Sequence, residues 1–260
     1  MALLTLLTDF GTRDPFVAAV KGVVLSKAPG VQIVDLGHEI APGDVEEAAF
    51  FLRYATPTYP PGTVHLAVVD PGVGSERRML ALATERFLFL APDNGLLTPL
   101  LDSTQGLWAI ERPDLYLPAP GATFHGRDRF APVAAWLLQG GDPAELGPRI
   151  EDPVRLDLPP PRREPRRLIG RVAHIDRFGN LITDVPFAWL EGGFVEARIG
   201  EHVTRRLVRN YAAIPEGEAA VLAGSLGTVE LAMDRVSLAA RWGVGRGGRV
   251  EVWVDLPSSG

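Results

Sequence analysis

The sequence has 260 residues, a formal net charge of −6 and no cysteine. The acidic balance argues against a nucleic-acid partner, because nucleic-acid-binding surfaces are basic, and the lack of cysteine excludes disulfides, thiolate catalysis and zinc–sulfur sites. No apolar run reaches the roughly 18 residues of a membrane-spanning helix, and the opening MALLTLL lacks the basic start and cleavage site of a signal peptide. We therefore expect a cytoplasmic protein with no membrane partner.

Strand-like and helix-like segments alternate along the first half of the chain. Apolar strands are expected at residues 3–10, 31–37 and 63–70, followed by two further apolar segments at 79–85 and 86–95. Helices are expected at 15–30, at 41–60 with Asp44 as N-cap, and at 129–141. Buried strands that alternate with amphipathic helices are typical of βαβ units, so the prediction is an α/β domain with a mostly parallel sheet over residues 1–155.

A stretch rich in proline and arginine, DLPPPRREPRR at residues 157–167, separates the two halves. Proline removes backbone donors and fixes φ, so this stretch fits neither a central strand nor a helix interior, and we interpret residues 156–166 as a stiff linker. Short strand patterns separated by glycine turns then predict a small antiparallel barrel or sandwich over residues 167–260. These patterns lie at 167–176, 180–185, 194–200, 204–210, 218–224, 228–233 and 248–256.

Polar clusters follow several of the expected strands in the first half. Their position matters, because ligands of open α/β sheets bind beyond the carboxyl ends of the strands. In TDFG, Asp9 either makes a local Asx turn or holds the two hydroxyls of a ribose. In APDNG, Asp93 and Asn94 precede Gly95 in a turn signal that needs no ligand to explain it.

The stretch HLAVVDPGVGSERR, residues 65–78, combines a strand, a glycine turn and opposite charges. Asp70 ends the strand and Arg77 follows the turn. The two residues are either a solvated charge pair or half of an active site. The lysine and Ser/Thr pair of a phosphate-binding P-loop is missing, which excludes hydrolysis of a nucleoside triphosphate.

The stretch TFHGRDRFAP, residues 123–132, is the most informative of these clusters. His125 and Arg127 lie just before a helix, whose N-terminus is electropositive and suits an anion or a water that loses a proton. The alternative is a capping Asp128 beside a neutral surface histidine. No HxH or HExxH spacing occurs, so a metal site is disfavoured. The other histidines are interpreted as structural: His38, His65, His174 and His202.

In the second half, HIDRFGNLITD at residues 174–184 is too rich in polar groups for a plain hairpin. The amide of Asn180 can both donate to and accept from an adenine edge, and the carboxylate of Asp176 can hold an ammonium group. The alternative is a β-turn with Asn180 in a left-handed conformation. Tyr211 either stacks on a ligand or packs in the core, and Ser225 either binds or turns.

Six motifs, in order along nearly the whole chain, resemble those of the S-adenosyl-L-methionine hydroxide adenosyltransferase family, relatives of the fluorinase and chlorinase. They are TDFG at 8–11, VVDPGVGSERR at 68–78, APDNG at 91–95, TFHGRD at 123–128, DRFGN at 176–180 and the glycine–serine turn near Ser225. The resemblance implies an N-terminal α/β domain, a C-terminal antiparallel β-barrel, and a homotrimer with sites between neighbouring subunits. It also implies S-adenosyl-L-methionine as substrate, adenosine and L-methionine as products, and neither cofactor nor metal ion.

By this resemblance the family's Asp–Arg–His set falls on Asp70, Arg77 and His125. The set would activate water or hydroxide for in-line displacement at C5′ of the ribose. Arg77 would favour the hydroxide form by its charge, and either Asp70 or His125 would accept the proton.

The resemblance also implies a set of substrate-binding residues: Asp9, Phe10, Asp93, Asn94, Asp176, Phe178, Asn180, Tyr211 and Ser225. Asp9 would hold the ribose hydroxyls and Asn180 would read adenine. Asp176 and Ser225 would hold the amino and carboxylate groups of methionine.

Two residues of this sequence depart from the family pattern. Gly224 precedes Ser225 where family members usually have asparagine, and Asp184 stands where they commonly have asparagine. The halogenating relatives lack the Asp–Arg–His set and carry an extra loop in the first domain, so water is favoured over halide here.

Three rival functions stay open. They are a non-catalytic trimer that senses S-adenosylmethionine or adenosine, a halogenase, and a metal-assisted hydrolase that uses Asp9, Asp70 and His125.

Overall fold

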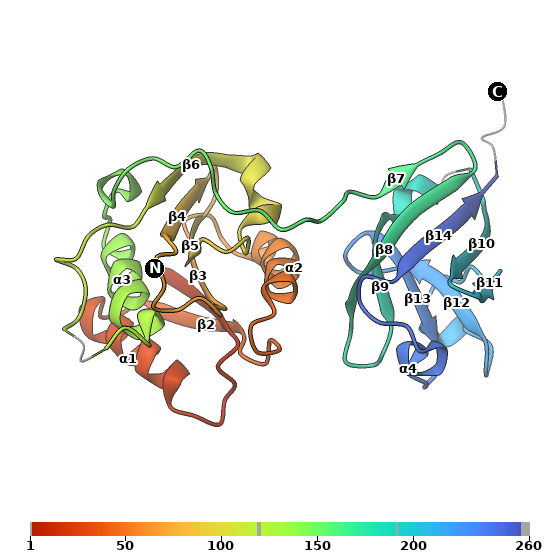
Figure 1. The fold of residues 1–260 in the computed structure, drawn as a ribbon. Coiled ribbons are helices and arrows are strands. Elements are labelled where there is room, and N and C mark those ends of the chain that lie inside the picture. Colours follow the sequence, from red (N-terminus) through yellow and green to blue (C-terminus); the bar gives the residue numbers. More distant parts are fainter. Residues whose placement is uncertain (1, 119–120, 191, 256–260) are drawn as a thin grey trace. The chain divides into compact units, whose positions relative to one another are not determined.

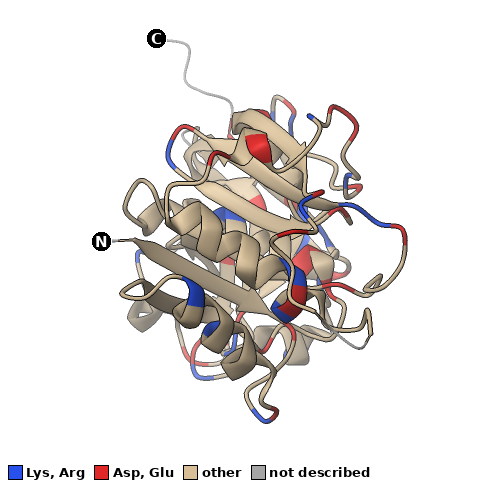
Figure 2. Ribbon diagram, turned by 90° about the vertical axis from the view of Figure 1, so that its left-hand side faces the viewer, with Lys and Arg blue, Asp and Glu red and all other residues tan. Residues whose placement is uncertain are grey.

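The computed structural model describes residues 2–118, 121–190 and 192–255. The chain divides into two compact units, Met1–Asp157 and Leu158–Gly260, which are described separately. None of the described helices is long and apolar enough to cross a membrane. Lysine, arginine, aspartate and glutamate lie mainly on loops and at the ends of elements, with both signs interspersed (Figure 2).

The described residues of the first unit form one sheet and three α-helices. Its strands are β1 (Leu3–Thr8), β2 (Gln32–Gly37), β3 (Val64–Val68), β4 (Met79–Thr84), β5 (Leu88–Pro92) and β6 (Thr104–Ala109). Its helices are α1 (Phe16–Lys27), α2 (Val45–Ala55) and α3 (Ala131–Leu138), with a π-helical turn at Gly126–Phe130 and 3₁₀ turns at Thr56–Thr58, Thr98–Ser103 and Pro143–Glu145. The expected N-cap of α2 is confirmed, because the Asp44 side chain accepts a hydrogen bond from Glu47 N at 2.9 Å.

The sheet has the order β2-β1-β3-β5-β4-β6 (Figure 1). β1 is parallel to β2 and β3, and β3 is parallel to β5, whereas β4 is antiparallel to both β5 and β6. Five of the six strands therefore run in one direction, which confirms the predicted α/β domain with a mostly parallel sheet. β4 is the exception because only residues 85–87 join it to β5, and so short a turn can connect only antiparallel strands.

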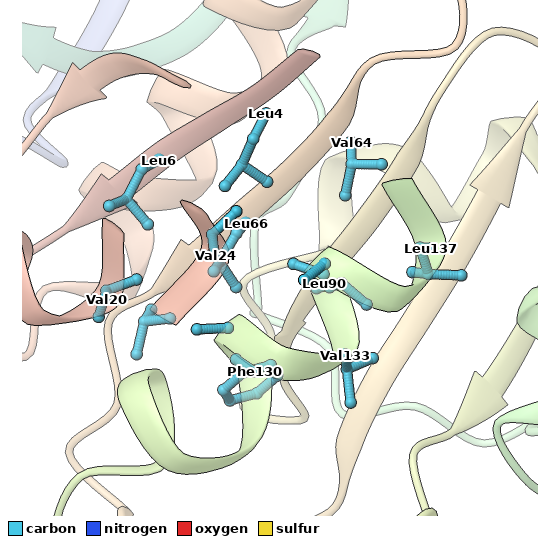
Figure 3. Packing of buried hydrophobic residues seen from close by; sticks show 14 of the residues in the cluster. Leu4, Leu6, Val20, Val24, Val64, Leu66, Leu90, Phe130, Val133 and Leu137 are labelled. Atoms are coloured by element: carbon cyan, nitrogen blue, oxygen red, sulfur yellow. The ribbon is translucent and has the colours of Figure 1, made fainter. Parts of the chain in front are cut away.

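The sheet is covered on both faces. α1 and α3 pack on one face and α2 packs on the other (Figure 1). Successive residues of β3 alternate between the two: Leu66 belongs to the cluster under α1 and α3, and Ala67 to the cluster under α2. Figure 3 shows Leu66 of β3 surrounded by side chains of the first cluster, such as Val24 of α1 and Val133 of α3.

The second unit is an antiparallel sheet that nearly closes on itself. Its strands are β7 (Arg162–Arg163), β8 (Arg167–Ile175), β9 (Leu181–Pro186), β10 (Phe194–Ile199), β11 (His202–Thr204), β12 (Ala219–Ala223), β13 (Thr228–Met233) and β14 (Arg249–Val254). Its helices are α4 (Leu238–Trp242) and 3₁₀ turns at Phe187–Leu190 and Tyr211–Ala213. The order is β11-β10-β14-β8-β9-β13-β12, with β7 beside β8. Hydrogen bonds from Val208 N to Val221 O and from Val221 N to Arg206 O, at 2.9 and 2.8 Å, link the two ends of the sheet, so the predicted barrel is confirmed.

Some elements differ from the expectation. The strand expected at 204–210 is wrong beyond Thr204, because only an isolated parallel bridge from Leu207 to Val221 follows. β6 and α4 were not expected. The strand expected at 248–256 is β14, and its last position, residue 256, lies outside the described residues. Within the stretch interpreted as a linker, Leu156 N donates to Thr98 Oγ1 at 2.8 Å, and Arg162–Arg163 pair with β8.

Candidate active site

The loop after β3 is a compact turn that returns the chain to its own start. Ser75 closes this turn, since its backbone N and its Oγ both donate to Gly72 O, at 3.1 and 2.7 Å. Gly74 has φ +84°, a left-handed conformation that favours glycine. The turn thereby brings Arg77 back against Asp70. Ser75 was not singled out from the sequence, although a serine two residues before the arginine is the group that shapes this turn.

Asp70 and Arg77 form a buried ion pair. Arg77 Nε donates to the two carboxylate oxygens of Asp70 at 2.8 and 3.0 Å, and Arg77 Nη2 also donates to Asp70 Oδ2. The side chains are only 4% and 8% exposed. A buried charge is stable only when it is paired and hydrogen-bonded. The alternative of a solvated charge pair therefore does not describe this structure.

His125 completes the cluster from the other side. It precedes the π-helical turn at Gly126–Phe130, a local irregularity that is frequent at functional sites. The distance from Arg77 Nη2 to His125 Nδ1 is 2.9 Å. The structure thus brings together Asp70, Arg77 and His125, which lie 55 positions apart at their extremes in the sequence (125 − 70 = 55).

The hydrogen bond from Arg77 determines the protonation of His125. A guanidinium group can only donate, so Nδ1 must accept and the ring proton must lie on Nε2. Burial, Arg129 and Arg77 lower the pKa of His125 from 6.5, which keeps the ring neutral. Nε2 is itself buried and has no hydrogen-bond partner among the described residues. An unsatisfied N–H of this kind is ready to bind an oxygen atom of a ligand or a water.

Asp9 and Phe10 lie beside this cluster. β1 pairs with β3 so that Thr8 is opposite Val68, and the residues that follow the two strands emerge side by side. Asp9 Oδ2 accepts a hydrogen bond from Gly43 N at 2.9 Å. Phe10 makes an edge-to-face contact with Phe124, the neighbour of His125 in sequence, at a centroid distance of 5.8 Å. The turn at Asp9–Phe10 thus borders the same end of the sheet as the charged cluster.

Asp93 and Asn94 bond mainly to the protein itself. Asn94 Nδ2 donates to Val69 O at 2.9 Å and thereby holds the end of β3 immediately before Asp70. Asp93 accepts from Arg78 Nε at 2.7 Å and from Val154 N at 2.8 Å. Both side chains therefore stabilise the loops around the cluster, and their expected contact with substrate stays a prediction.

In the second unit, four of the predicted binding residues line one cleft of about 540 Å³. They are Asp176, Phe178, Asn180 and Tyr211, and the rest of the lining is Met233–Val236. Asp176 Oδ1 accepts from Phe178 N and Asn180 N, both at 2.9 Å, and Asp176 Oδ2 accepts from Asn180 Nδ2 at 2.9 Å. These bonds fold the turn so that the Phe178 ring stands 76% exposed.

Glu230 is a residue of this cleft region that sequence reasoning missed. It is buried in β13, and Tyr211 Oη donates to Glu230 Oε1 at 2.5 Å. Burial raises the pKa of Glu230, and the nearby Asp176 raises it further. Partial burial and the contact with Glu230 raise the pKa of Tyr211. A glutamate in the middle of the apolar strand TVELAM was the available signal.

The remaining candidates are not part of either cluster. Ser225 is exposed and does not line the cleft. A Cβ atom at Gly224 would lie 2.9 Å from Glu230 Oε2, so a larger residue there would need Glu230 to move. Asp184 Oδ1 accepts from Arg171 N at 2.8 Å, and Arg127 pairs with Asp128. Among the residues that the structure describes, no three of His, Cys, Asp or Glu are grouped so as to hold a metal ion.

Both parts of the chain match a known protein family. Two family models match, the SAM hydroxide adenosyltransferase N-terminal domain over residues 4–147 and the C-terminal domain over residues 170–251. The chain belongs to the SAM hydroxide adenosyltransferase family. The resemblance inferred from the motifs is therefore confirmed.

Proteins with two different names are similar to this chain. A protein of Thermus thermophilus called (R)-S-adenosyl-L-methionine hydrolase is 44% identical over 250 residues, which cover 93% of this chain and 95% of the relative. A fluorinase of an Actinoplanes species is 31% identical over 235 residues, covering 79% and 78%. The solved structure of an uncharacterized conserved protein from Thermotoga maritima has a TM-score of 0.90 at 33% identity and covers 96% of this chain and 99% of that chain.

Proposed function

We propose that this protein hydrolyses S-adenosyl-L-methionine to adenosine and L-methionine. The observation that carries the proposal is the buried cluster of Asp70, Arg77 and His125, which presents an unpartnered N–H beside a buried ion pair. The identity to relatives called (R)-S-adenosyl-L-methionine hydrolase, 44% in one case against 31% to a fluorinase, favours water over halide and favours the (R) form of the substrate.

The reaction is an in-line displacement at C5′ of the ribose. The oxygen of water or hydroxide forms a bond to C5′ while the bond from C5′ to sulfur breaks, and its electron pair returns to sulfur. The sulfonium leaves as the neutral thioether of L-methionine, so no acid is needed to protonate the leaving group. The protein has to align the nucleophile, exclude other water and stabilise the hydroxide form.

The three residues divide these tasks. The positive charge of Arg77 lowers the pKa of a nearby water. His125, neutral and protonated on Nε2, donates a hydrogen bond that holds the oxygen nucleophile. Since His125 Nδ1 already accepts from Arg77, Asp70 is the better acceptor for the released proton, through the carboxylate lone pairs that Arg77 leaves free.

The proposal assigns substrate contacts to residues of each unit. Asp9 holds the ribose hydroxyls, with Phe10 beside it, and the exposed ring of Phe178 stacks on adenine. Asn180 contacts the adenine edge. The remaining contacts of the proposal are the methionine ligands Asp176 and Ser225, the ring of Tyr211, and Asp93 and Asn94. The protein acts in the cytoplasm as a homotrimer with sites between neighbouring subunits, and it needs neither cofactor nor metal ion.

The test uses protein stripped of metal ions, in oxygen-18 water, with the (R) and (S) forms of S-adenosylmethionine supplied separately. Mass spectrometry should find labelled adenosine and L-methionine, and Asp70→Ala should abolish both. Tight binding without adenosine would support the sensor instead. Halogenated nucleoside formed in chloride or fluoride would support a halogenase, and activity lost on chelation and restored by a metal ion would support a metal-assisted hydrolase.

A further inference from the structure

β1 carries two buried threonines that each contact a histidine of a neighbouring segment. Thr5 Oγ1 lies 2.6 Å from His65 Nδ1, and Thr8 Oγ1 lies 2.9 Å from His38 Nδ1. Both threonines are fully buried. The two pairs have the same chemistry, but their surroundings differ, and this difference indicates what the second pair does.

The His65 pair ends in the core. The ring of His65 stacks on Phe89 at 4.8 Å and meets Tyr59 and Phe87 edge to face. Burial lowers the pKa of His65 to about 3, so the ring is neutral. This pair fills space and satisfies a buried hydroxyl, which fits its interpretation as structural.

The His38 pair continues to charged groups at the surface. His38 Nε2 lies 3.0 Å from Asp35 Oδ1, and Lys21 Nζ of α1 lies 2.7 Å from Asp35 Oδ2. Partial burial opposes ionisation of Asp35, but the contacts with Lys21 and His38 outweigh it and lower the pKa of Asp35. We call Lys21, Asp35, His38 and Thr8 the His38 chain. His38 Nε2 makes no hydrogen bond among the described residues, so Asp35 acts on the ring through its charge at this 3.0 Å distance, and a carboxylate placed beside a ring nitrogen favours one orientation of the imidazole.

The inner end of the His38 chain lies at the turn that bears Asp9. Phe10 N donates to Thr8 Oγ1 at 3.3 Å, and Gly11 N donates to His38 O at 2.7 Å. The two residues that follow Asp9 are therefore bonded to the His38 chain, Phe10 through the side chain of Thr8 and Gly11 through the carbonyl of His38. Gly11 has φ +66°, so this turn adopts a backbone conformation that its neighbours must hold in place.

We propose that Thr8 and His38 are positioning residues, which hold the turn at Asp9–Phe10 in the geometry that binds the ribose, and that Asp35 and Lys21 hold His38. The inference rests on the proposed function, because it assigns a task to residues around the proposed ribose site. The proposal gives His38 a task beyond the structural role expected from the sequence. Asp9 contacts the ribose before and during the reaction, so a misplaced turn weakens both states equally and raises KM while kcat changes little.

The decisive variants are Thr8→Val, which removes the hydroxyl at constant shape, and Thr8→Ser, which keeps it. Thr8→Val should raise KM about tenfold, the value of one good hydrogen bond, with kcat within about threefold of wild type, and Thr8→Ser should restore KM. Thr5→Val is the matched control in the same strand. Thr5→Val should lower the thermal midpoint about as much as Thr8→Val does, and it should leave KM unchanged.

An unchanged KM in Thr8→Val, or an equal rise of KM in Thr5→Val, would overturn the inference. Asp35→Ala tests the His38 chain at a half-exposed position, without a change in the core. KM should rise about threefold in this variant. An unchanged KM in Asp35→Ala counts against the role of the His38 chain even if Thr8→Val does not fold. Calorimetric binding of S-adenosylmethionine separates the two proposals. Wild type that binds but does not turn over refutes the proposed function, and the dissociation constants of the variants then decide the positioning inference.

Discussion

The charged cluster of the first unit and the cleft of the second unit are built in opposite ways. Asp70 and Arg77 are 4% and 8% exposed and satisfy each other, whereas the ring of Phe178 is 76% exposed. Buried charges must find partners within the folded chain, so the cluster has its final geometry before any ligand arrives. An exposed aromatic ring loses water only when something covers it. The first region is therefore suited to catalysis and the second to recognition.

The contrast between the two regions predicts that the largest loss of kcat follows from a substitution of Arg77. Arg77→Lys keeps the charge but cannot donate to both carboxylate oxygens of Asp70 and to His125 at once. We expect kcat to fall by about a thousandfold, as when preorganised donors are removed from an active site. Steady-state turnover of S-adenosylmethionine measures it, with Arg86→Lys at an exposed position as control. A kcat within tenfold of wild type would show that the guanidinium geometry is not needed.

His125 allows a finer test of the same cluster. His125→Gln keeps an N–H donor near the position of Nε2, whereas His125→Asn keeps only an acceptor near Nδ1. If the ring acts as a donor, kcat of His125→Gln should exceed that of His125→Asn by about tenfold. The reverse order would show that the position of Nδ1, which accepts from Arg77, matters more than the donor at Nε2.

The pH dependence checks the same assignment in wild type. The pKa of His125 lies below 6.5, so the neutral ring and the activity should persist as the pH falls through 6.5. Over the same range the unfolded chain takes up a proton that the folded protein does not, and the free energy of unfolding should decrease. An acid limb of kcat/KM centred at or above 6.5 that is absent from His125→Gln would contradict the lowered pKa.

In the cleft we expect an effect on binding alone. Phe178→Ala removes an exposed ring, so the thermal midpoint should not change, while KM should rise about tenfold through lost stacking on adenine. Kinetics and calorimetric binding of adenosine measure the effect. Val195→Ala, also exposed and in the same unit, is the control. A fall in kcat at constant KM would mean that the cleft takes part in the chemistry, and the contrast between the two regions would then fail.

Much of the first region could be predicted from the sequence, because its signals are local. Asp70 and Arg77 are joined by a six-residue segment whose glycines indicate a turn. The alternation of strands and helices predicts which strand ends meet. The antiparallel direction of β4 was not predicted, because the direction of this strand depends on its short connection to β5. The strand expected at 204–210 failed for a related reason: apolar alternation does not reveal whether a partner strand is within reach.

The sequence by itself determined the two fold classes, the turn that pairs Asp70 with Arg77, and the motifs that mark the family. Only the tertiary structure decided which nitrogen of His125 carries the proton, that Glu230 lies beneath Tyr211, and that His38 continues to charged groups while His65 ends among aromatic rings. The physical reason is that the protonation and orientation of a buried polar side chain depend on its partners. Those partners come from other strands, and folding alone brings them within hydrogen-bond distance.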